Sequence, residues 1–275
     1  MPFDPKPTKY PYPDLTDGHY LVVKKDSGEV FDKDYDFIGT AKGYKFKSAI
    51  VRLGLYTLVF PGTRLILGLK VKGRNNLKKY KDVLSKGCVT VGNHVHLYDY
   101  VMEMYALRPR KTRILSWSKN LTGENKFFVR HSGGIPIPEN DRKASAAMVN
   151  AVVNYLKNGG WLHVSAEGSM WEYYMPIRPF KTGAAHFAYL AGVPVLPMAF
   201  SYREPKGLYK LLGRKALFTL SIGEPLFADE SLSRMDAIED LTKRVHGEVC
   251  RLAGIDPKDN IYPPIFENSH KINYY

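Results

Sequence analysis

The chain has 275 residues, which is enough for one large domain or for a domain with an extension, and its 44% hydrophobic content is ordinary for a protein that buries a core. Its two cysteines, Cys88 and Cys250, lie far apart without metal-ligand spacing. This pattern indicates a reducing compartment and excludes a disulfide scaffold. Residues 1–7 lack the charged start and apolar core of a signal peptide.

The net charge of +13 is concentrated near the N-terminus. Residues 48–87 hold nine basic residues and one acidic residue, which accounts for most of the surplus. A basic region of this kind fits an anionic membrane surface or a nucleic acid. No nucleic-acid-binding motif accompanies it, so we expect no nucleic-acid partner.

The same region contains the longest apolar stretch, residues 51–71. Three basic residues and Pro61-Gly62 interrupt it, whereas a membrane-spanning helix needs about 20 nearly uninterrupted apolar residues. We therefore expect a hairpin of two short amphipathic helices over residues 48–73, lying in a membrane interface with cations toward anionic head groups. The alternative is two helices packed on the core with a solvated basic face.

The remaining elements follow in chain order. Residues 1–43 show no sustained periodicity and predict an irregular arm with one short strand at 19–23. After the hairpin, strands and helices alternate: strands at 89–92, 112–116, 161–165, 193–200 and 216–222, and helices at 99–107, 143–157, 182–191 and 231–252. This alternation predicts an α/β fold with a mostly parallel central sheet flanked by helices. The expected units are an arm (1–47), a membrane-interface hairpin (48–73) and a catalytic α/β domain (74–275).

His94 and Asp99 follow the first strand of that domain, within the segment Val91-Gly-Asn-His-Val-His-Leu-Tyr-Asp99. A histidine held by an aspartate can act as a general base, because the carboxylate fixes the ring tautomer and stabilises the charged imidazole. The positive end of the helix that begins here favours the neutral, proton-accepting ring. The alternative is an ordinary hydrogen-bonded His–Asp pair.

Two further clusters also lie where predicted strands end, which is where sites form in α/β sheets. The first is Gly133-Gly134 with an apolar run, followed by Arg142, which could hold an anionic group. The second is Glu167-Gly168-Ser169, where Glu167 could bind a polyol hydroxyl and Ser169 an anion. The alternatives are a loop that opens a helix and a turn with a solvent-facing glutamate.

A third cluster, Arg178-Pro-Phe-Lys181-Thr-Gly, opens the helix at 182–191. Two cations at a helix N-terminus suit a phosphate, because the first amides of a helix are free to donate. The alternative is plain surface charge.

In this order the blocks resemble the glycerolipid acyltransferase family, whose best-known members are 1-acylglycerol-3-phosphate acyltransferases. The resemblance covers about residues 71–200 and rests on Asn93-His94-x4-Asp99, the glycine-led block, the Glu-Gly-Ser block and Val193-Pro-Val-Leu-Pro197.

Two blocks depart from the family pattern. Ser169-Met170 stands where the family has Thr and usually Arg, and Pro138-Glu139 stands where it tends to place Asp-Arg. In the family, those arginines are associated with the phosphate of the acceptor. Their role could pass to Arg142, Arg178 or Lys181.

The resemblance implies an enzyme of phospholipid biosynthesis that transfers a fatty acyl group from acyl-CoA or acyl carrier protein to the free hydroxyl of a lysophospholipid. His94 would be the general base and Asp99 its orienting partner. Asn93, Gly134, Arg142, Glu167, Gly168, Ser169, Arg178 and Lys181 would bind substrate.

We expect no metal or cofactor beyond the acyl thioester co-substrate, and we expect peripheral attachment to the cytoplasmic side of a membrane. Two alternatives remain open: a catalytically silent lipid-binding homologue, and a metal-dependent hydrolase with His94 and His96 as ligands together with Asp99.

Overall fold

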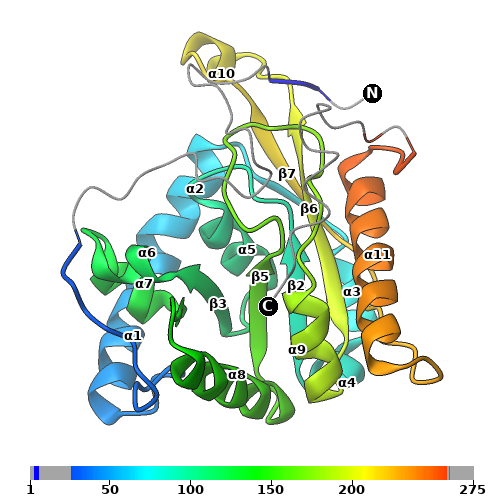
Figure 1. The fold of residues 1–275 in the computed structure, drawn as a ribbon. Coiled ribbons are helices and arrows are strands. Elements are labelled where there is room, and N and C mark those ends of the chain that lie inside the picture. Colours follow the sequence, from blue (N-terminus) through cyan, green and yellow to red (C-terminus); the bar gives the residue numbers. More distant parts are fainter. Residues whose placement is uncertain (1–2, 6–25, 259, 261–275) are drawn as a thin grey trace.

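A seven-stranded sheet forms the centre of the computed structural model, which describes residues 3–5, 26–258 and 260 (Figure 1). The strand order is β1-β7-β6-β2-β5-β3-β4. The strands are β1 (Lys70–Lys72), β2 (Cys88–Gly92), β3 (Thr112–Trp117), β4 (Gly134–Ile137), β5 (Trp161–Ser165), β6 (Val195–Arg203) and β7 (Leu217–Ile222). The strand expected at 19–23 lies outside the described residues.

Five neighbouring strands, β6 to β4 in this order, run parallel, whereas β7 is antiparallel to β6 and β1 is parallel to β7. The mostly parallel sheet predicted from the alternation is therefore confirmed. β2 lies near the middle, between β5 and β6, and all five of its residues are buried. Burial on both faces explains its uninterrupted small and apolar sequence, Cys-Val-Thr-Val-Gly.

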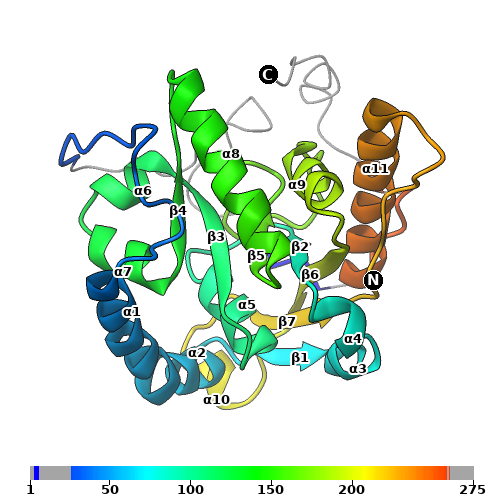
Figure 2. The same ribbon diagram turned by 90° about the horizontal axis from the view of Figure 1, so that it is seen from below.

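Helices cover both faces of the sheet (Figure 2). One face packs against α8 (Arg142–Lys157), α9 (Gly183–Ala191) and α11 (Arg234–Ala253), and the other packs against α2 (Phe60–Ile66), α4 (Lys81–Leu84) and α5 (Asp99–Leu107). The short helices α3 (Arg74–Lys79), α6 (Ser118–Thr122), α7 (Lys126–Ser132) and α10 (Leu208–Leu211) lie in connections. The four helices expected after residue 74 thus appear as α5, α8, α9 and α11.

Local sequence signals set the ends of the long helices. Asp141 caps α8 by accepting from the backbone N–H groups of Lys143 and Ala144, and the Ser233 side chain caps α11. α9 and α11 both end at a glycine with left-handed backbone, Gly192 and Gly254. These caps fix the lengths of the helices that bury the sheet.

The N-terminal helix differs from the expected hairpin over residues 48–73. α1 (Lys42–Gly54), the π-helical turn η1 (Leu55–Val59) and α2 follow one another without a break. The hairpin prediction is wrong because the wider π turn, in which the Phe60 N–H bonds to the Leu55 carbonyl, admits Pro61 near the start of α2. A single helix therefore runs from residue 42 to residue 66.

This 25-residue helix is long and apolar enough to cross a membrane by length and composition, which the interruptions at Pro61-Gly62 had been expected to prevent. Leu55, Phe60 and Thr63 face the domain and are buried. The opposite face exposes large apolar side chains, namely Phe46, Ile50, Leu53, Leu58 and Leu65. Only 17% of the most apolar 18-residue stretch of this helix is buried. Most of its apolar side chains therefore point away from the domain.

Gly87, directly before β2, is expected to be essential for stability. Its φ is +123°, and an added Cβ would lie 2.2 Å from the Leu156 carbonyl oxygen. We predict that Gly87→Ala lowers the free energy of unfolding by ~3 kcal/mol or more, from backbone strain and overpacking together. Gly192→Ala is the matched control, because its φ is +64° but an added Cβ meets nothing within 4 Å; it should lose only about 1 kcal/mol. The measurement is urea unfolding. Equal losses of unfolding free energy in Gly87→Ala and Gly192→Ala would contradict this prediction.

Candidate active site

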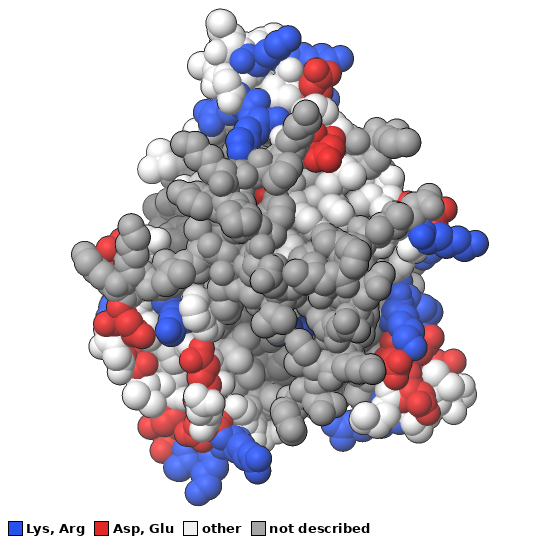
Figure 3. All heavy atoms as spheres, turned by 45° about the horizontal axis from the view of Figure 1, so that its top comes forward, with Lys and Arg blue, Asp and Glu red and all other residues white. Residues whose placement is uncertain are grey.

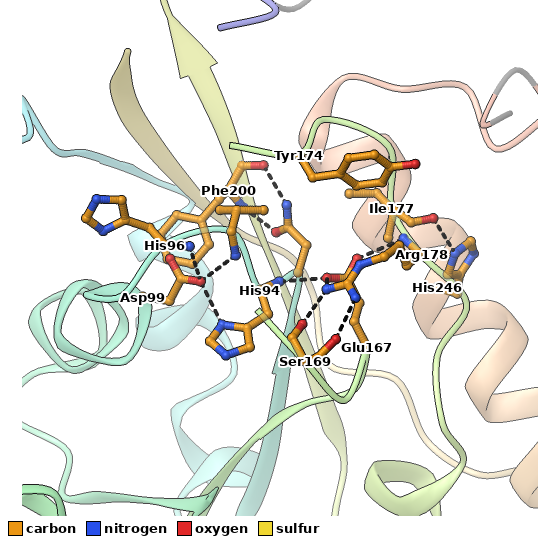
Figure 4. Close-up of polar contacts among 12 residues, drawn as sticks. His94, His96, Asp99, Glu167, Ser169, Tyr174, Ile177, Arg178, Phe200 and His246 are labelled. Carbon is orange, nitrogen blue, oxygen red and sulfur yellow. Dashed lines mark hydrogen bonds and ion pairs between the residues drawn. The ribbon is translucent and has the colours of Figure 1, made fainter. Parts of the chain in front are cut away.

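The loop that joins β2 to α5 carries the His94–Asp99 pair at the carboxyl edge of the parallel strands (Figure 4). His94 Nδ1 lies 2.9 Å from Asp99 Oδ2. The same oxygen accepts from the backbone N–H groups of Val95 at 2.6 Å and His96 at 2.9 Å. Asp99, the first residue of α5, thus folds the preceding loop back onto its own carboxylate.

These contacts determine the tautomer of His94. Because Asp99 Oδ2 is already the acceptor of two backbone donors, the imidazole nitrogen beside it must carry a hydrogen and donate. Nε2 is then the unprotonated nitrogen. No described residue bonds to Nε2, and the His94 side chain is 27% exposed against 4% for Asp99. The ring is therefore held through Nδ1, and its Nε2 is open to an incoming group.

Glu167, which follows β5, holds the backbone of this loop rather than facing solvent. Its Oε2 accepts from the His94 N–H at 2.9 Å, and its two oxygens accept from the Arg178 backbone N–H and guanidinium, each at 2.8 Å. Arg178 is fully buried and also donates to the hydroxyl of Ser169 at 2.9 Å and to its carbonyl oxygen. The carboxylate and guanidinium compensate one another in the interior.

This arrangement changes the expected roles of three residues. Arg178, expected at a phosphate, is 0% exposed and is occupied by Glu167 and Ser169. Glu167 and Ser169, expected at substrate hydroxyls and anions, are themselves buried. The expectation assumed that polar side chains after strands face the cleft; here they bond to one another because Arg178 comes from the neighbouring segment and neutralises the carboxylate.

Asn93, Gly168 and Lys181 lie around the same strand ends. Asn93 is buried and bridges β2 to β6, donating to the Phe200 carbonyl and accepting from the Phe200 N–H at 2.7 Å. Gly168 has a φ of +83°, and the alkyl chain of the half-buried Lys181 lies over it, 2.8 Å from where a Cβ would stand. Of the expected cations, Lys181 thus lies beside the Glu-Gly-Ser turn.

Gly134 and Arg142 are farther away. Gly134 is buried in β4, where an added Cβ would lie 2.7 Å from the Val129 carbonyl, so it serves a close backbone approach. Arg142 is the exposed first residue of α8, just after β4. β4 lies three strand steps from β2, about 14 Å at ~4.8 Å per step. The structure therefore does not gather these two residues with the His–Asp pair.

A second buried pair, Glu103 and His163, was not foreseen from the sequence. Glu103 lies one turn after Asp99 on α5, and His163 is in the middle of β5. Glu103 Oε2 lies 3.0 Å from His163 Nε2, and both side chains are almost fully buried. His163 Nδ1 lies 3.0 Å from the Thr90 hydroxyl. The i, i+4 spacing of two acids on a buried helix was the available signal.

The pair is held in its neutral form. Burial raises the pKa of Glu103 well above its ordinary value, and the Asp99 carboxylate adds to the rise. Burial, with a smaller contribution from His94, lowers the pKa of His163 to about 3. Glu103 therefore keeps its proton, and His163 is neutral.

His96, considered above as a metal ligand, sits in an apolar pocket instead. Its Nδ1 lies 3.2 Å from the Tyr98 N–H, which donates to it, and its ring packs against Tyr173 and Phe218. Burial lowers its pKa. Within residues 3–5, 26–258 and 260, no group of three or more His, Cys, Asp or Glu side chains is arranged to hold a metal ion.

The segment that carries this site is similar to known proteins. The family model described as Acyltransferase matches residues 68–201, which run from just before β1 to within β6. The matched segment is just under half of the chain and is similar to acyltransferases. It contains His94, Asp99 and the Glu167–Arg178 pair, and it excludes the helix of residues 42–66.

Curated relatives and one solved structure are similar to the chain. A 1-acyl-sn-glycerol-3-phosphate acyltransferase of Salmonella typhimurium and one of Escherichia coli are each 30% identical over 147 residues, covering 51% of this chain and 56% of the relative. The chain thus spans about half the length of the curated relatives it matches. The crystal structure of PlsC, the 1-acyl-sn-glycerophosphate acyltransferase of Thermotoga maritima, is 19% identical and covers 74% of this chain and 88% of that chain at a TM-score of 0.44.

Removing the Glu167 carboxylate should destabilise the α/β domain. Glu167→Ala leaves the fully buried Arg178 without its partner, so we predict a loss of ~3–5 kcal/mol in the free energy of unfolding. The double variant Glu167→Leu/Arg178→Met removes both charges and should recover part of that loss. Glu239→Ala, which breaks the exposed Glu239–Lys243 pair, is the control and should leave stability nearly unchanged. A stable Glu167→Ala protein would contradict this account.

The free energy of unfolding of Glu103→Gln, relative to that of the wild-type protein, should increase as the pH rises. Above the ordinary glutamate value of 4.5 the unfolded chain releases the Glu103 proton while the folded chain keeps it, so the wild-type protein loses stability with rising pH. Glutamine has no such proton, and the stability of the variant relative to wild type should grow by at most about 1.4 kcal/mol per pH unit.

The measurement is urea unfolding of both proteins between about pH 5 and about pH 8. His163 contributes equally to both and cancels in the difference. A stability difference that stays constant between these pH values would show that the folded protein holds no proton on Glu103 and would contradict this account.

Proposed function

We propose that this protein transfers a fatty acyl group from an acyl thioester to the free hydroxyl of a lysophospholipid such as 1-acylglycerol-3-phosphate, as a step of phospholipid biosynthesis. The observation that carries the proposal is the outward-facing Nε2 of His94, held by Asp99 within a segment that is similar to acyltransferases. The printed names of the curated relatives support the choice of acceptor. The donor is acyl-CoA or acyl carrier protein, with no metal or other cofactor.

His94 Nε2 takes the proton of the acceptor hydroxyl as its oxygen attacks the carbonyl carbon of the thioester. Nδ1 meanwhile keeps its hydrogen bond to Asp99, whose negative charge stabilises the imidazolium. The tetrahedral intermediate then collapses: the carbon–sulfur bond breaks, the imidazolium returns the proton to the leaving thiolate, and the ester is complete. Direct transfer of this kind needs no enzyme nucleophile.

Lys181 and Arg142 are the proposed contacts for an acceptor phosphate. Lys181 lies over Gly168, beside the loop that holds His94, whereas Arg142 stands at the far side of the sheet edge. The Glu167–Arg178 pair supports the site from the interior, since Glu167 accepts from the His94 backbone N–H and is paired with the buried Arg178. We therefore assign substrate contact to Lys181 ahead of Arg142.

The acceptor is a lipid, and the helix of residues 42–66 supplies the means to reach it. One face packs on the domain through Leu55 and Phe60, and the outward face presents large apolar side chains. We propose that this face lies in the interface of an anionic membrane, on its cytoplasmic side, so that attachment is peripheral. The arm, this helix and the catalytic domain remain the proposed organisation of the chain.

Replacing His94 tests the chemistry. His94→Asn should lower the rate of acyl transfer by about 10²–10⁴-fold, because general-base catalysis is lost while the fold is kept. His131→Asn, at a half-buried histidine of α7, is the control and should keep its activity. Products are followed by mass spectrometry, with lysophosphatidic acid beside uncharged and zwitterionic lysolipids and with both donor types.

Near-full activity of His94→Asn would overturn the mechanism. Failure of the wild-type protein to acylate any acceptor with either donor would instead support a lipid-binding protein without catalysis.

A further inference from the structure

The connection between β6 and β7 ends in an apolar tip. Leu208, Leu211 and Leu212, in and beside the short helix α10, are 67%, 84% and 59% exposed. Soluble surfaces rarely present three neighbouring leucines to water, so this group marks an interaction site. Its position at the extremity of the molecule is visible in Figure 1.

Several backbone N–H groups of the tip are hydrogen-bonded to carbonyl groups within the tip. The N–H groups of Lys210 and Leu211 bond to the Gly207 carbonyl, that of Leu212 to Leu208, and that of Arg214 to Tyr209. Backbone groups that are already paired can enter a less polar medium at little cost, whereas an open loop cannot. The leucine side chains can therefore be inserted without breaking the structure of the turn.

Basic side chains surround the leucines. Lys206, Lys210, Arg214 and Lys215 are all exposed, and Glu204 is the one acidic residue between β6 and β7. Lys and Arg side chains gather at this protrusion in the space-filling view (Figure 3). Apolar side chains ringed by cations match the interface of an anionic bilayer, where acyl chains lie beneath negatively charged head groups.

The tip extends from the same sheet edge that carries the candidate active site. β6 runs parallel to β2, so the residues after Arg203 continue beyond the carboxyl end of β2, where His94 follows. Lys215, at the base of the tip, lies over the ring of Tyr173, and the Tyr173 N–H bonds to the Val95 carbonyl. A surface bound at the tip therefore lies on the side from which a lipid would approach His94.

The tip also continues the apolar face of the N-terminal helix. The chain after α2 joins the base of the β6–β7 connection: the Phe218 N–H donates to the Leu67 carbonyl, and the Arg203 guanidinium donates to the Gly68 carbonyl. Leu65 and Ile66, at the end of α2, are 68% and 50% exposed. Two exposed apolar surfaces thus meet at one end of the molecule.

We propose that the α10 tip, residues 206–215, is a second membrane contact that inserts its leucines into an anionic bilayer. With the helix of residues 42–66 it would set the angle at which the domain sits, turning the sheet edge with His94 toward the lipid. The proposal goes beyond the acyl-transfer reaction, because membrane binding by the tip requires no catalysis.

Vesicle co-sedimentation of the full chain tests it. The double variant Leu211→Glu/Leu212→Glu should bind mixed phosphatidylglycerol–phosphatidylcholine vesicles about 100-fold more weakly than wild type, given the apolar burial lost. Lys206→Glu/Lys210→Glu should bind about 30-fold more weakly, and only on vesicles that contain phosphatidylglycerol. Met235→Glu is the control: this exposed methionine starts α11, at the end of the molecule opposite α10 (Figure 1).

A second measurement locates the contact directly. Cys88 and Cys250 are buried, so a single cysteine introduced as Leu211→Cys can carry a polarity-sensitive fluorophore. Its emission should shift to shorter wavelength with anionic vesicles, whereas the same label at Met235→Cys should not respond. Unchanged binding of Leu211→Glu/Leu212→Glu, equal loss in Met235→Glu, or an unresponsive label at position 211 would each overturn the proposal.

The same variants keep this proposal separate from the proposed reaction. Leu211→Glu/Leu212→Glu should retain wild-type turnover of a short-chain lysolipid presented as monomers, because neither leucine takes part in the hydrogen bonds that hold His94. Loss of turnover on monomers would show that the tip belongs to the catalytic machinery and would overturn the membrane role. An inactive wild-type protein that still binds vesicles through the tip would contradict only the reaction.

Discussion

One oxygen of Asp99 determines the geometry of the candidate site. It receives the imidazole N–H of His94 and two backbone N–H groups of the loop between β2 and α5. A carboxylate that accepts several donors holds both a loop conformation and a ring orientation at once. The free nitrogen of His94, and every catalytic step assigned to it, depends on this single acceptor.

Two buried pairs lie near the start of that loop. Glu167 and Arg178 hold the His94 backbone as an ion pair, whereas Glu103 and His163 fill the space behind Gly92 as a neutral pair. The difference matters because an ionised Glu103 would add a second negative charge near Asp99. A protonated Glu103 adds no negative charge beside the His94–Asp99 pair.

The sequence predicted the elements whose signals are local. β2, β5, α5 and α8 follow from apolar runs, helical periodicity and caps such as Asp141, and the parallel sheet follows from their alternation. β1 and β4 were not assigned as strands because each has only three or four residues and is recognised by its neighbours, not by its own pattern. The continuous N-terminal helix was missed because a π turn, which has no sequence signature, accommodates Pro61.

The site shows the same division between local and long-range information. The His94–Asp99 contact joins residues five positions apart in one turn, and their spacing pointed to it. Arg178 pairs with Glu167 from eleven positions away, and Glu103 on α5 contacts His163 in β5. Neither the burial nor the charge state of these side chains could therefore be deduced from composition. Polar residues at strand ends were assigned to substrate because their interior partners were unknown.

The tautomer of His94 tests the account most directly. Nitrogen NMR of the protein with ¹⁵N-labelled histidine, with His94 assigned by its loss in His94→Asn, reports which ring nitrogen carries the hydrogen when the ring is neutral. We predict a protonated Nδ1 and a free Nε2, with the preference lost in Asp99→Ala. A neutral His94 protonated at Nε2 would leave no base facing the acceptor and would contradict the account.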